Sequence, residues 1–477
     1  MNDYKLPSLR QAARRSREVV IEDNLFVLPE ELKTLGKGKK YFIRTHGCQA
    51  NERDSETMSG ILNDMGYTAA ADASEADLIL INTCAIRENA EQKVLGEFGF
   101  FKEYKRRNPD LLLAMAGCMA QEEKTVEEIL RKYPQVDLIF GTHNIYRLPL
   151  LLERAVRDKK RVVEVYSKQG EVIENLPASR SLSHKAWVNI MYGCDKFCTY
   201  CIVPYTRGKE RSRRMGEIVE EVRQLKEAGY KEVTLLGQNV NAYGLDLGME
   251  SGFAQLLEEV AKTEIPRIRF TTPHPRNFDE EAVAMLAKYP NIMPSFHLPV
   301  QSGSNRVLKA MNRSYTRETY LDLFDRIKKT VPGASFTTDI IVGFPNETEE
   351  EFLETLSLYD YCAFDNAFTF IFSPRAGTPA AKIEDLTPRE VKEDRLRRLN
   401  EKVVYYAKKH NLEYQDRIVE VLTDGPSKKR SDIYAGYTKE NKLVNFQGKD
   451  LRPGDLVQVK ITECHNFSLN GVAIEKD

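Results

Sequence analysis

The stretch Cys194-Asp195-Lys196-Phe197-Cys198-Thr199-Tyr200-Cys201 carries three cysteines in a C-x3-C-x2-C pattern. Three thiolates on one short loop can bind three irons of a cubane [4Fe–4S] cluster and leave the fourth iron without a protein ligand. Such an open iron is a Lewis acid beside a redox-active cluster, so it can bind a small molecule and pass one electron to it. The pattern therefore predicts a cluster-bearing loop around which the rest of the chain is organised.

A structural zinc loop is the alternative interpretation of the same cysteines. Structural zinc sites are closed by four ligands, which usually come as paired C-x2-C units. No second pair lies near residues 194–201 in the sequence. The spacing therefore favours an iron–sulfur cluster over zinc.

Length and composition limit the class of protein. The chain has 477 residues, of which 42% are hydrophobic, and the length predicts about three domains. A formal net charge of -1 excludes a uniformly basic nucleic-acid coat, so any RNA contact must come from local patches. No apolar run is long enough to cross a bilayer, and residues 1–37 lack a signal-peptide core. We expect a cytoplasmic protein without a membrane partner, whose eight cysteines serve metal binding or catalysis.

A second set of three cysteines lies in the first third of the chain, and each follows a short apolar run. The runs cover residues 41–43, 77–82 and 111–116, and the cysteines that follow them are Cys48, Cys84 and Cys118. Ligands gather outside the carboxyl ends of parallel strands. We therefore expect these thiolates to hold an auxiliary iron–sulfur cluster that again has an open iron.

The surroundings of these cysteines predict a doubly wound α/β domain over residues 39–157. Helical patterns near 53–65, 87–107 and 121–132 separate the apolar runs, as in alternating parallel strands and helices. Asp54 or Ser55 is expected to cap the first helix. Residues 1–38 are charged and irregular, and we expect a short helix and a flexible arm there.

Residues 180–411 alternate strand and helix patterns and predict a partial (β/α)6 barrel. The strand candidates are residues 186–191, 232–236, 268–271, 295–298, 336–342 and 367–372. Six strands are fewer than the eight of a closed barrel, so one side stays open for a large substrate. The cysteine loop follows the first strand and lies at the carboxyl-terminal mouth, where barrel chemistry occurs.

Polar residues at the ends of other barrel strands are candidates for holding the small molecule on the open iron. Glycine allows close backbone approach, and amide or carboxylate groups can bind amino and hydroxyl groups. His297 could equally be a structural histidine, and Asn239 could cap a turn. The candidates are Gly237, Gln238, Asn239, His297, Gln301, Thr338 and Asp339.

Residues 412–477 predict a small antiparallel β-barrel of the OB-like kind, which often binds RNA. Tyr434, Tyr437 and Phe446 are candidates for stacking on bases. Basic residues here and just after the cysteine loop could contact phosphates, although a solvated charged loop would explain the latter run equally well. The candidate RNA-binding residues are Arg207, Arg211, Arg213, Arg214, Lys428, Lys429 and Arg430.

From Lys40 onward the chain resembles the radical S-adenosylmethionine (SAM) methylthiotransferases, and among them the MiaB-type tRNA enzymes. The resemblance includes the order of a methylthiotransferase domain, a radical-SAM barrel and a TRAM barrel. It does not account for the residues before Tyr41. The motifs that carry it are Thr45–Asn51, Ile81–Cys84, Ala116–Cys118, Gly193–Gly208 and His297–Ser304.

The resemblance implies two [4Fe–4S] clusters, with SAM as both methyl donor and radical source. A SAM-derived radical would form at the cluster of Cys194, Cys198 and Cys201, and the auxiliary cluster would carry the sulfur. The implied product bears a methylthio group on carbon 2 of N6-isopentenyladenosine next to the tRNA anticodon. No side chain is implied as a catalytic acid or base, because an unactivated aromatic C–H bond requires a radical.

Several alternatives and partners remain open at the level of the sequence. The same chemistry could act on threonylcarbamoyladenosine in tRNA or on an aspartate of a ribosomal protein, although the stretch Pro204–Gly208 argues against both. A non-enzymatic protein that binds zinc and RNA is the third reading. We expect tRNA and an electron donor such as flavodoxin or ferredoxin as partners, and a monomer. The sequence names neither the sulfur donor nor the ligand of the open auxiliary iron.

Overall fold

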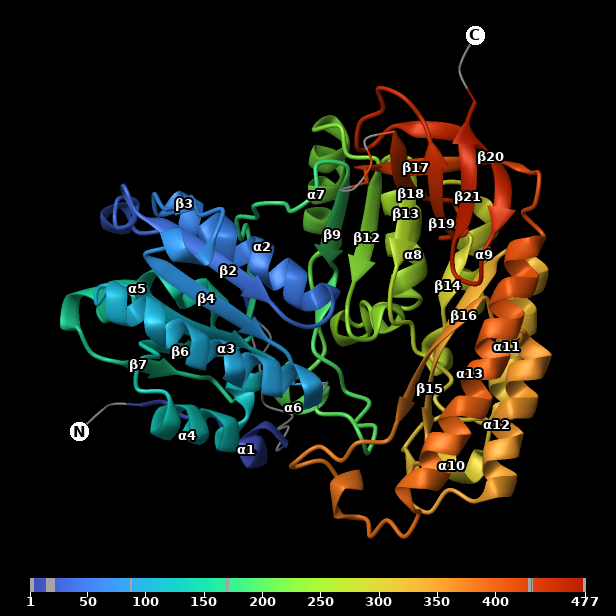
Figure 1. The fold of residues 1–477 in the computed structure, drawn as a ribbon, viewed down its shortest axis with the longest axis horizontal. Helices are drawn as coiled ribbons and strands as arrows, with labels where there is room; N and C mark the ends of the chain where they lie inside the picture. Colours follow the sequence, from blue (N-terminus) through green and yellow to red (C-terminus); the bar gives the residue numbers. More distant parts are fainter. Residues whose placement is uncertain are drawn as a thin grey trace. The chain divides into compact units, whose positions relative to one another are not determined.

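The computed structural model describes residues 4–13, 22–85, 88–167, 171–427, 430 and 432–474 (Figure 1). The chain forms two compact units, which are described separately below. The first contains Met1–Ser181, Met191–Phe197 and Cys201–Arg213, and the second contains Leu182–Ile190, Cys198–Tyr200 and Arg214–Asp477. None of the described helices is long and apolar enough to cross a membrane.

The first unit is built on a six-stranded parallel sheet with the order β3-β2-β4-β5-β6-β7. Strand order reverses between β2 and β4, because β3 lies on the far side of β2, and ligands of doubly wound sheets bind at such a switch point. The three predicted runs are confirmed as β2, β4 and β5. The strands are β2 (Lys40–Thr45), β3 (Thr68–Ala69), β4 (Leu78–Thr83), β5 (Leu112–Gly117), β6 (Leu138–Phe140) and β7 (Val162–Glu164).

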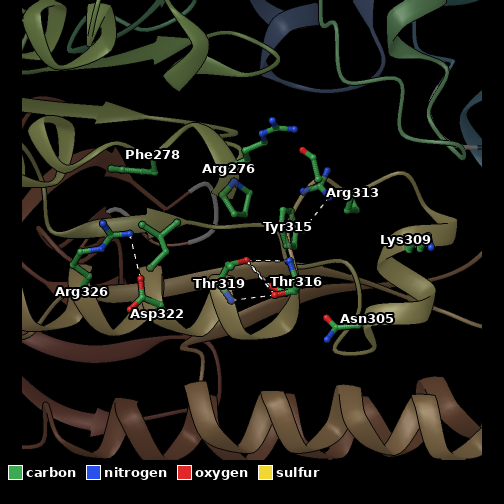
Figure 2. Close-up of a pocket in the computed structure, with 13 residues that line it drawn as sticks. Arg276, Phe278, Asn305, Lys309, Arg313, Tyr315, Thr316, Thr319, Asp322 and Arg326 are labelled. Atoms are coloured by element: carbon green, nitrogen blue, oxygen red, sulfur yellow. Dashed lines mark hydrogen bonds and ion pairs between the residues drawn. The ribbon is translucent and has the colours of Figure 1, made fainter.

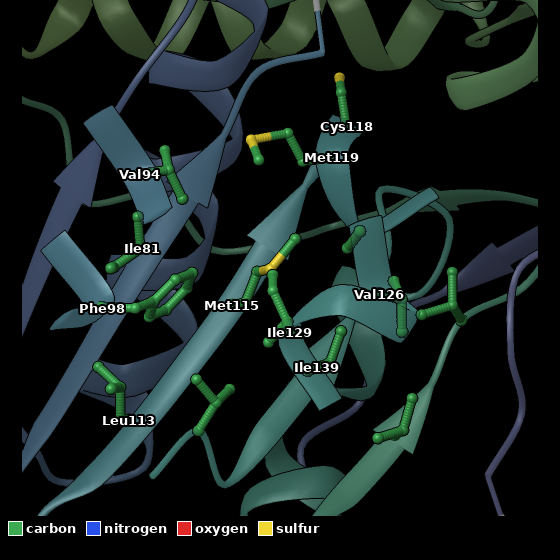
Figure 3. Close-up of a cluster of buried hydrophobic side chains, with 14 of the residues drawn as sticks. Ile81, Val94, Phe98, Leu113, Met115, Cys118, Met119, Val126, Ile129 and Ile139 are labelled. Carbon is green, nitrogen blue, oxygen red and sulfur yellow. The ribbon is translucent and has the colours of Figure 1, made fainter. Parts of the chain in front are cut away.

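Helices cover both faces of this sheet, as predicted for a doubly wound domain. Helices α2 (Gln49–Asp64) and α5 (Leu148–Asp158) pack on one face, and α3 (Glu88–Arg107) and α4 (Glu123–Lys132) pack on the other. Successive strand residues point to opposite faces, so Ile79 and Ile81 join one core cluster while Leu78 and Leu80 join the other. Figure 3 shows the first of these clusters around β4 and β5.

The predicted cap of α2 was wrong. The helix begins at Gln49 and its N-cap is Cys48, so Asp54 and Ser55 lie inside the helix. Both are buried and make tertiary hydrogen bonds, and Ser55 Oγ lies 2.8 Å from Thr45 Oγ1 on β2. Side chains that resemble caps in the sequence therefore attach the helix to the sheet.

The residues before Lys40 that the structure describes are packed, in contrast to the flexible arm that we expected. Strand β1 (Glu22–Leu25) pairs in parallel with β8 (Glu171–Glu174). In the short helix α1 (Leu9–Ala13), Ala12 is buried in the core cluster of α3 and α4. This segment completes the first unit instead of extending from it.

The second unit contains the six predicted barrel strands, which confirms the partial barrel. They form two three-stranded parallel sheets, β9-β12-β13 and β14-β15-β16, and a single parallel bridge from Ile268 to Ile292 joins β13 to the segment before β14. The strands are β9 (Lys185–Asn189), β12 (Glu232–Leu236), β13 (Arg267–Phe270), β14 (Ser295–His297), β15 (Ser335–Val342) and β16 (Asn366–Ile371). The helices are α7 (Met215–Glu227), α8 (Gly252–Ala261), α9 (Glu280–Lys288), α10 (Asn305–Ala310), α11 (Arg317–Thr330), α12 (Glu349–Cys362) and α13 (Arg389–Leu412).

The C-terminal part of the second unit is a closed five-stranded barrel with the order β17-β18-β19-β21-β20. The predicted small barrel is confirmed, and its neighbouring strands are antiparallel except β19 and β21, which pair in parallel. Arg267 on β13 is almost fully buried and donates to Tyr437 O at 2.9 Å, which attaches this barrel to the larger one. The strands are β17 (Ile418–Pro426), β18 (Ile433–Tyr437), β19 (Leu443–Gln447), β20 (Leu456–Cys464) and β21 (Leu469–Ala473).

Two of the aromatic residues predicted to stack on RNA bases belong instead to the core of this barrel. Tyr434 and Phe446 are 6% and 1% exposed, and their rings stack on each other. Tyr437 is half-buried, and its ring faces the Lys185 ammonium. Strand alternation makes one face of each strand the interior of a closed barrel, and these two rings lie on that face.

Candidate metal centres

Cys48, Cys84 and Cys118 lie at the carboxyl edge of the sheet in the first unit. Cys48 follows β2, Cys84 immediately follows β4, and Cys118 immediately follows β5 as the first residue of a 3-10 turn, η3 (Cys118–Gln121). These strands are neighbours, and β2 and β4 flank the switch point. The structure therefore brings the three predicted thiols to the edge where such sheets bind ligands.

Glycines allow the cysteine loops to approach closely. Gly47 has φ 131°, and a Cβ there would stand 2.9 Å from Cys84 Cβ. Gly117 has φ 94°, and a Cβ there would stand 2.4 Å from Thr83 O. Neither position has room for a side chain. This close packing explains why a glycine directly precedes both Cys48 and Cys118 in the sequence.

The thiols of Cys84 and Cys118 are buried and that of Cys48 is half-buried, and the three are close enough to influence one another electrostatically. Cys84 and Cys118 are each 2% exposed, and Figure 3 shows the sulfur of Cys118 directed away from the packed side chains. Burial raises the pKa of the Cys118 thiol to about 12, and the neighbouring Cys84 and Cys48 raise it further while Arg207 opposes them. A bound cation can deprotonate such thiols, since a coordinating thiol loses its proton to the metal.

The number and kind of these side chains bear on the metal group that they could hold. Cys48, Cys84 and Cys118 offer three thiols, none of which is in a disulfide. In a cubane cluster each thiolate binds a different iron, so its ligands stand further apart than the ligands of one ion. Three neighbouring thiols at the sheet edge, two of them buried, fit that donor set.

Arg207 belongs to this cysteine site, which is a correction to its predicted place on an RNA-binding surface. Its buried Nη2 donates to Asp54 Oδ2 at 2.7 Å and to Asn51 Oδ1 at 3.4 Å, both on α2. Burial lowers the pKa of Arg207, but Asp54 and the thiols of Cys118 and Cys48 outweigh burial and raise that pKa. The guanidinium is thus a fixed positive charge beside the thiols.

Asn51 extends this network to the cysteines. The Cys48 thiol donates to Asn51 Oδ1 at 3.5 Å, and Asn51 Nδ2 donates to Thr83 O at 2.9 Å, next to Cys84. A short helix, α6 (Val203–Thr206), ends immediately before Arg207. The segment that leaves Cys201 therefore reaches the auxiliary cysteines within the first unit.

The loop that begins at Cys194 is held by backbone contacts within the first unit. Gly193 has φ 74°, and a Cβ there would stand 2.1 Å from Lys209 O. Cys194 N–H donates to Gly208 O at 3.0 Å, and Asp195 N–H donates to Glu210 Oε1 at 3.1 Å. Residues 208–210 thus support the start of the cysteine loop.

Cys198 and its neighbours are assigned to the second unit, where Arg313 meets the thiol. Arg313 Nη1 lies 3.4 Å from Cys198 Sγ, and the hydrogen bond would strengthen if the sulfur were a thiolate. Thr199 donates its N–H to Met311 O at 3.0 Å and its hydroxyl to Ala310 O at 2.9 Å. Sequence reasoning missed Arg313, because nothing in its neighbourhood forms a recognisable motif.

The residues predicted to hold the small molecule all lie in the second unit. Gly237 directly follows β12 and His297 ends β14, whereas Thr338 and Asp339 lie in the middle of β15 and not at its end. His297 and Asp339 are brought together, with Nε2 3.4 Å from Oδ2. Gln301 is buried with φ 68°, and its N–H donates to Asp339 O at 2.8 Å. Thr338 donates to Leu298 O at 2.9 Å and accepts the N–H of Val300 at 3.0 Å, so its hydroxyl ties the strands together.

The strand-end loop of β12 carries the remaining candidates for that role. Gly237 O accepts the hydroxyl of Thr272 at 2.6 Å, and Asn239 is 1% exposed. Gln238 is half-buried. A role of these residues in cofactor binding remains a prediction.

The predicted RNA-binding arginines differ in exposure. Arg211 and Arg213 are buried, and Arg213 Nε donates to Glu174 at 2.8 Å, so they fit the interior of the first unit better than a phosphate-binding surface. Arg214 is exposed. Arg430 is exposed and pairs with Asp432 at 2.6 Å, while Lys428 and Lys429 lie outside the described residues.

Family models match three parts of the chain. The Radical SAM superfamily matches residues 188–359, the Uncharacterized protein family UPF0004 matches residues 40–141, and the TRAM domain matches residues 413–474. The cysteine loop falls in the first match, and the three auxiliary cysteines fall in the second.

Curated relatives match the chain over nearly its whole length. A protein of Bacillus cytotoxicus is 58% identical over 99% of this chain and 93% of its own length. A protein of Anoxybacillus flavithermus is 57% identical over 98% of this chain and 89% of its own length. Both are called tRNA-2-methylthio-N(6)-dimethylallyladenosine synthase.

Among solved structures, the chain resembles the radical S-adenosylmethionine methyltransferase TsrM from Kitasatospora setae with cobalamin and a [4Fe-4S] cluster bound. The TM-score is 0.54 at 15% identity, over 72% of this chain and 74% of that one. At this identity the likeness supports the fold alone.

Proposed function

Because this chain belongs to the family of tRNA-2-methylthio-N(6)-dimethylallyladenosine synthases, we propose that it adds a methylthio group to carbon 2 of N6-isopentenyladenosine beside the tRNA anticodon. It is a radical-SAM enzyme with a TRAM domain at its carboxyl end. The relatives do not favour threonylcarbamoyladenosine, a ribosomal protein or a zinc-binding role without catalysis.

The observation that carries the proposal is the presence of two separate cysteine triads in one chain. One triad lies at the switch point of a doubly wound sheet, and the other lies in the loop that follows the first barrel strand. When bound, two [4Fe–4S] clusters and SAM supply the radical and the methylthio group. Transfer of sulfur to an aromatic carbon needs both a hydrogen-abstracting radical and a sulfur source, which two metal centres can divide between them.

The chain's own residues would bind the two clusters, offset part of their negative charge and orient their ligands. Cys48, Cys84 and Cys118 would hold the auxiliary cluster, and Arg207 would offset part of its negative charge. Cys194, Cys198 and Cys201 would hold the SAM cluster, with the Arg313 N–H directed at Cys198. Burial of Cys84, Cys118 and Cys198 keeps water from these three thiols and strengthens their electrostatic contacts.

The remaining assignments complete the proposal. His297, Gln301 and Asp339, which meet where β14 ends, are proposed to position SAM together with Gly237, Gln238, Asn239 and Thr338. The exposed Arg214 and Arg430 are proposed to contact tRNA phosphates, since the TRAM domain is expected to bind RNA. Flavodoxin or ferredoxin is the proposed electron donor. We also propose that the protein is a monomer and lies in the cytoplasm. The proposed domains are 1–38, 39–157, 180–411 and 412–477.

Mass spectrometry of tRNA nucleosides tests the proposed function in cells. A strain that lacks the protein is expected to accumulate N6-isopentenyladenosine and to lose its 2-methylthio form. The reason is that prenylation of the adenosine still occurs, whereas methylthiolation does not. Wild-type protein should restore the modified nucleoside, whereas the Cys194→Ala variant should not. Normal levels of the 2-methylthio nucleoside in the deletion strain would contradict the proposal.

A further inference from the structure

A pocket at the mouth of the partial barrel has no role in the function described so far. It lies entirely within the second unit and has a volume of about 720 Å³ (Figure 2). Its walls come from the loop after β13, the turn that joins α10 to α11, and the first turns of α11. The residues that matter to its charge are Arg276, Lys309, Arg313, Asp322 and Arg326.

Four cationic side chains and one carboxylate line this rim pocket, although the whole chain carries a net charge of -1. Arg326 lies 3.6 Å from Asp322 and 3.5 Å from Glu280, so its charge is largely offset. Arg276 and Lys309 are exposed, and neither has a carboxylate partner among the described residues. The pocket therefore keeps uncompensated positive charge, which attracts an anion.

The cations are distributed along the pocket. In the view of Figure 2, Arg326 lies at one end and Lys309 at the other, with Arg276 and Arg313 between them. Hydroxyl groups of Ser314, Thr316 and Thr319 line the same walls and can donate hydrogen bonds. Such a pocket is too large for one small anion and suits an extended polyanion with several charges.

Arg313 connects the rim pocket to the cysteine loop. It lines the pocket, and its Nη1 lies 3.4 Å from Cys198 Sγ. Arg313 Nη2 also donates to Pro299 O at 3.2 Å, just after β14, which places the pocket at the carboxyl ends of the strands. A ligand in the pocket would lie beside the loop where the radical forms.

We propose that this rim pocket binds the sugar–phosphate backbone of the tRNA anticodon loop next to the nucleotide that is modified. The inference rests on the proposed function, because it takes RNA as the substrate. Arg276 and Lys309 would each bind a phosphate, and the pocket would hold the strand while the target base enters the barrel mouth. Such contacts give affinity and register without reading the sequence of bases.

The salt dependence of RNA binding tests this inference. The probe is an anticodon stem-loop RNA with N6-isopentenyladenosine, titrated with the holoenzyme between about 50 and 200 mM salt. For the double variant Arg276→Gln/Lys309→Gln we expect several-fold weaker binding and a slope of log K against log salt that is less steep by about 1.5, since each lost phosphate contact removes about 0.7 to 0.9. The variant Arg276→Lys/Lys309→Arg should retain the wild-type slope.

The matched control is Lys328→Gln/Lys329→Gln, which removes the same charge from exposed residues of α11 that do not line the pocket. Binding and turnover of this control should equal those of the wild type. An unchanged salt slope in the pocket variant, or an equal change of slope in the control, would overturn the inference. The proposed function would still stand in that case, provided that the wild-type enzyme forms product. Absence of RNA binding by the wild type would instead contradict the proposed function, and the inference with it.

Discussion

Replacement of Cys48, Cys84 and Cys118 by Ala is expected to abolish methylthio transfer and to leave SAM cleavage intact. Replacement of Cys194, Cys198 and Cys201 is expected to abolish both, because no radical forms without their cluster. Each triple variant should keep about half of the wild-type iron, since one of two four-iron clusters remains. The measurements are bound iron, 5′-deoxyadenosine and methylthiolated product.

The chain supplies a control for general effects of losing a thiol. Cys362 and Cys464 are buried free cysteines outside both triads. Their replacement by Ala should leave iron content and product unchanged. Loss of both clusters from either triple variant, with its circular dichroism preserved, would show that the two sites do not load independently.

The second large effect concerns the buried ion pair at the auxiliary site. The variant Arg207→Met leaves Asp54 buried without its cation, so we expect about 3–5 kcal/mol less stability of the first unit and lower occupancy of the auxiliary cluster. Hydrogen exchange of the amides in β4 and β5 measures this stability without contributions from the second unit. The control variant Arg131→Met, at an exposed position of α4 in the same unit, should change it by less than about 0.5 kcal/mol.

A double-mutant cycle separates the pair from its surroundings. In Arg207→Met/Asp54→Asn neither charge remains, so the combined loss should be smaller than the sum of the two single losses. Arg207→Lys should recover part of the stability, because it restores the charge without the planar fork of the guanidinium. Additive losses in the cycle would mean that Arg207 acts on the site through packing alone.

Local sequence patterns were sufficient for β2, β4 and β5 and for the six barrel strands, but not for β3, β6 and β7 at the sides of the first sheet. Continuous apolar runs indicated β4 and β5, and alternating strand and helix patterns indicated the partial barrel. Parallel strands end at one edge of the sheet, so the cysteines that follow these runs were expected at that edge. These features depend on periods of a few residues, which a single sequence displays.

Features that depend on distant partners could not be predicted. Arg207 lies in a charged run that is typical of a solvated loop, but its partner Asp54 is 153 positions away in the sequence. Tyr434 and Phe446 alternate correctly for strands, yet only closure of the barrel decides which face is interior. The rim pocket combines segments between Pro275 and Arg326 that share no motif, so only the fold reveals its charge.

The measurement that tests the central claim most directly is turnover by the reconstituted enzyme on three matched tRNAs. They carry N6-isopentenyladenosine, unmodified adenosine or threonylcarbamoyladenosine at the same position. We predict product on the first and little on the others, because an apolar prenyl group gains about 25 cal/mol per Å² on burial while threonylcarbamoyl brings a carboxylate that requires a cation. Equal turnover on all three, or a preference for the threonylcarbamoylated tRNA, would contradict the account.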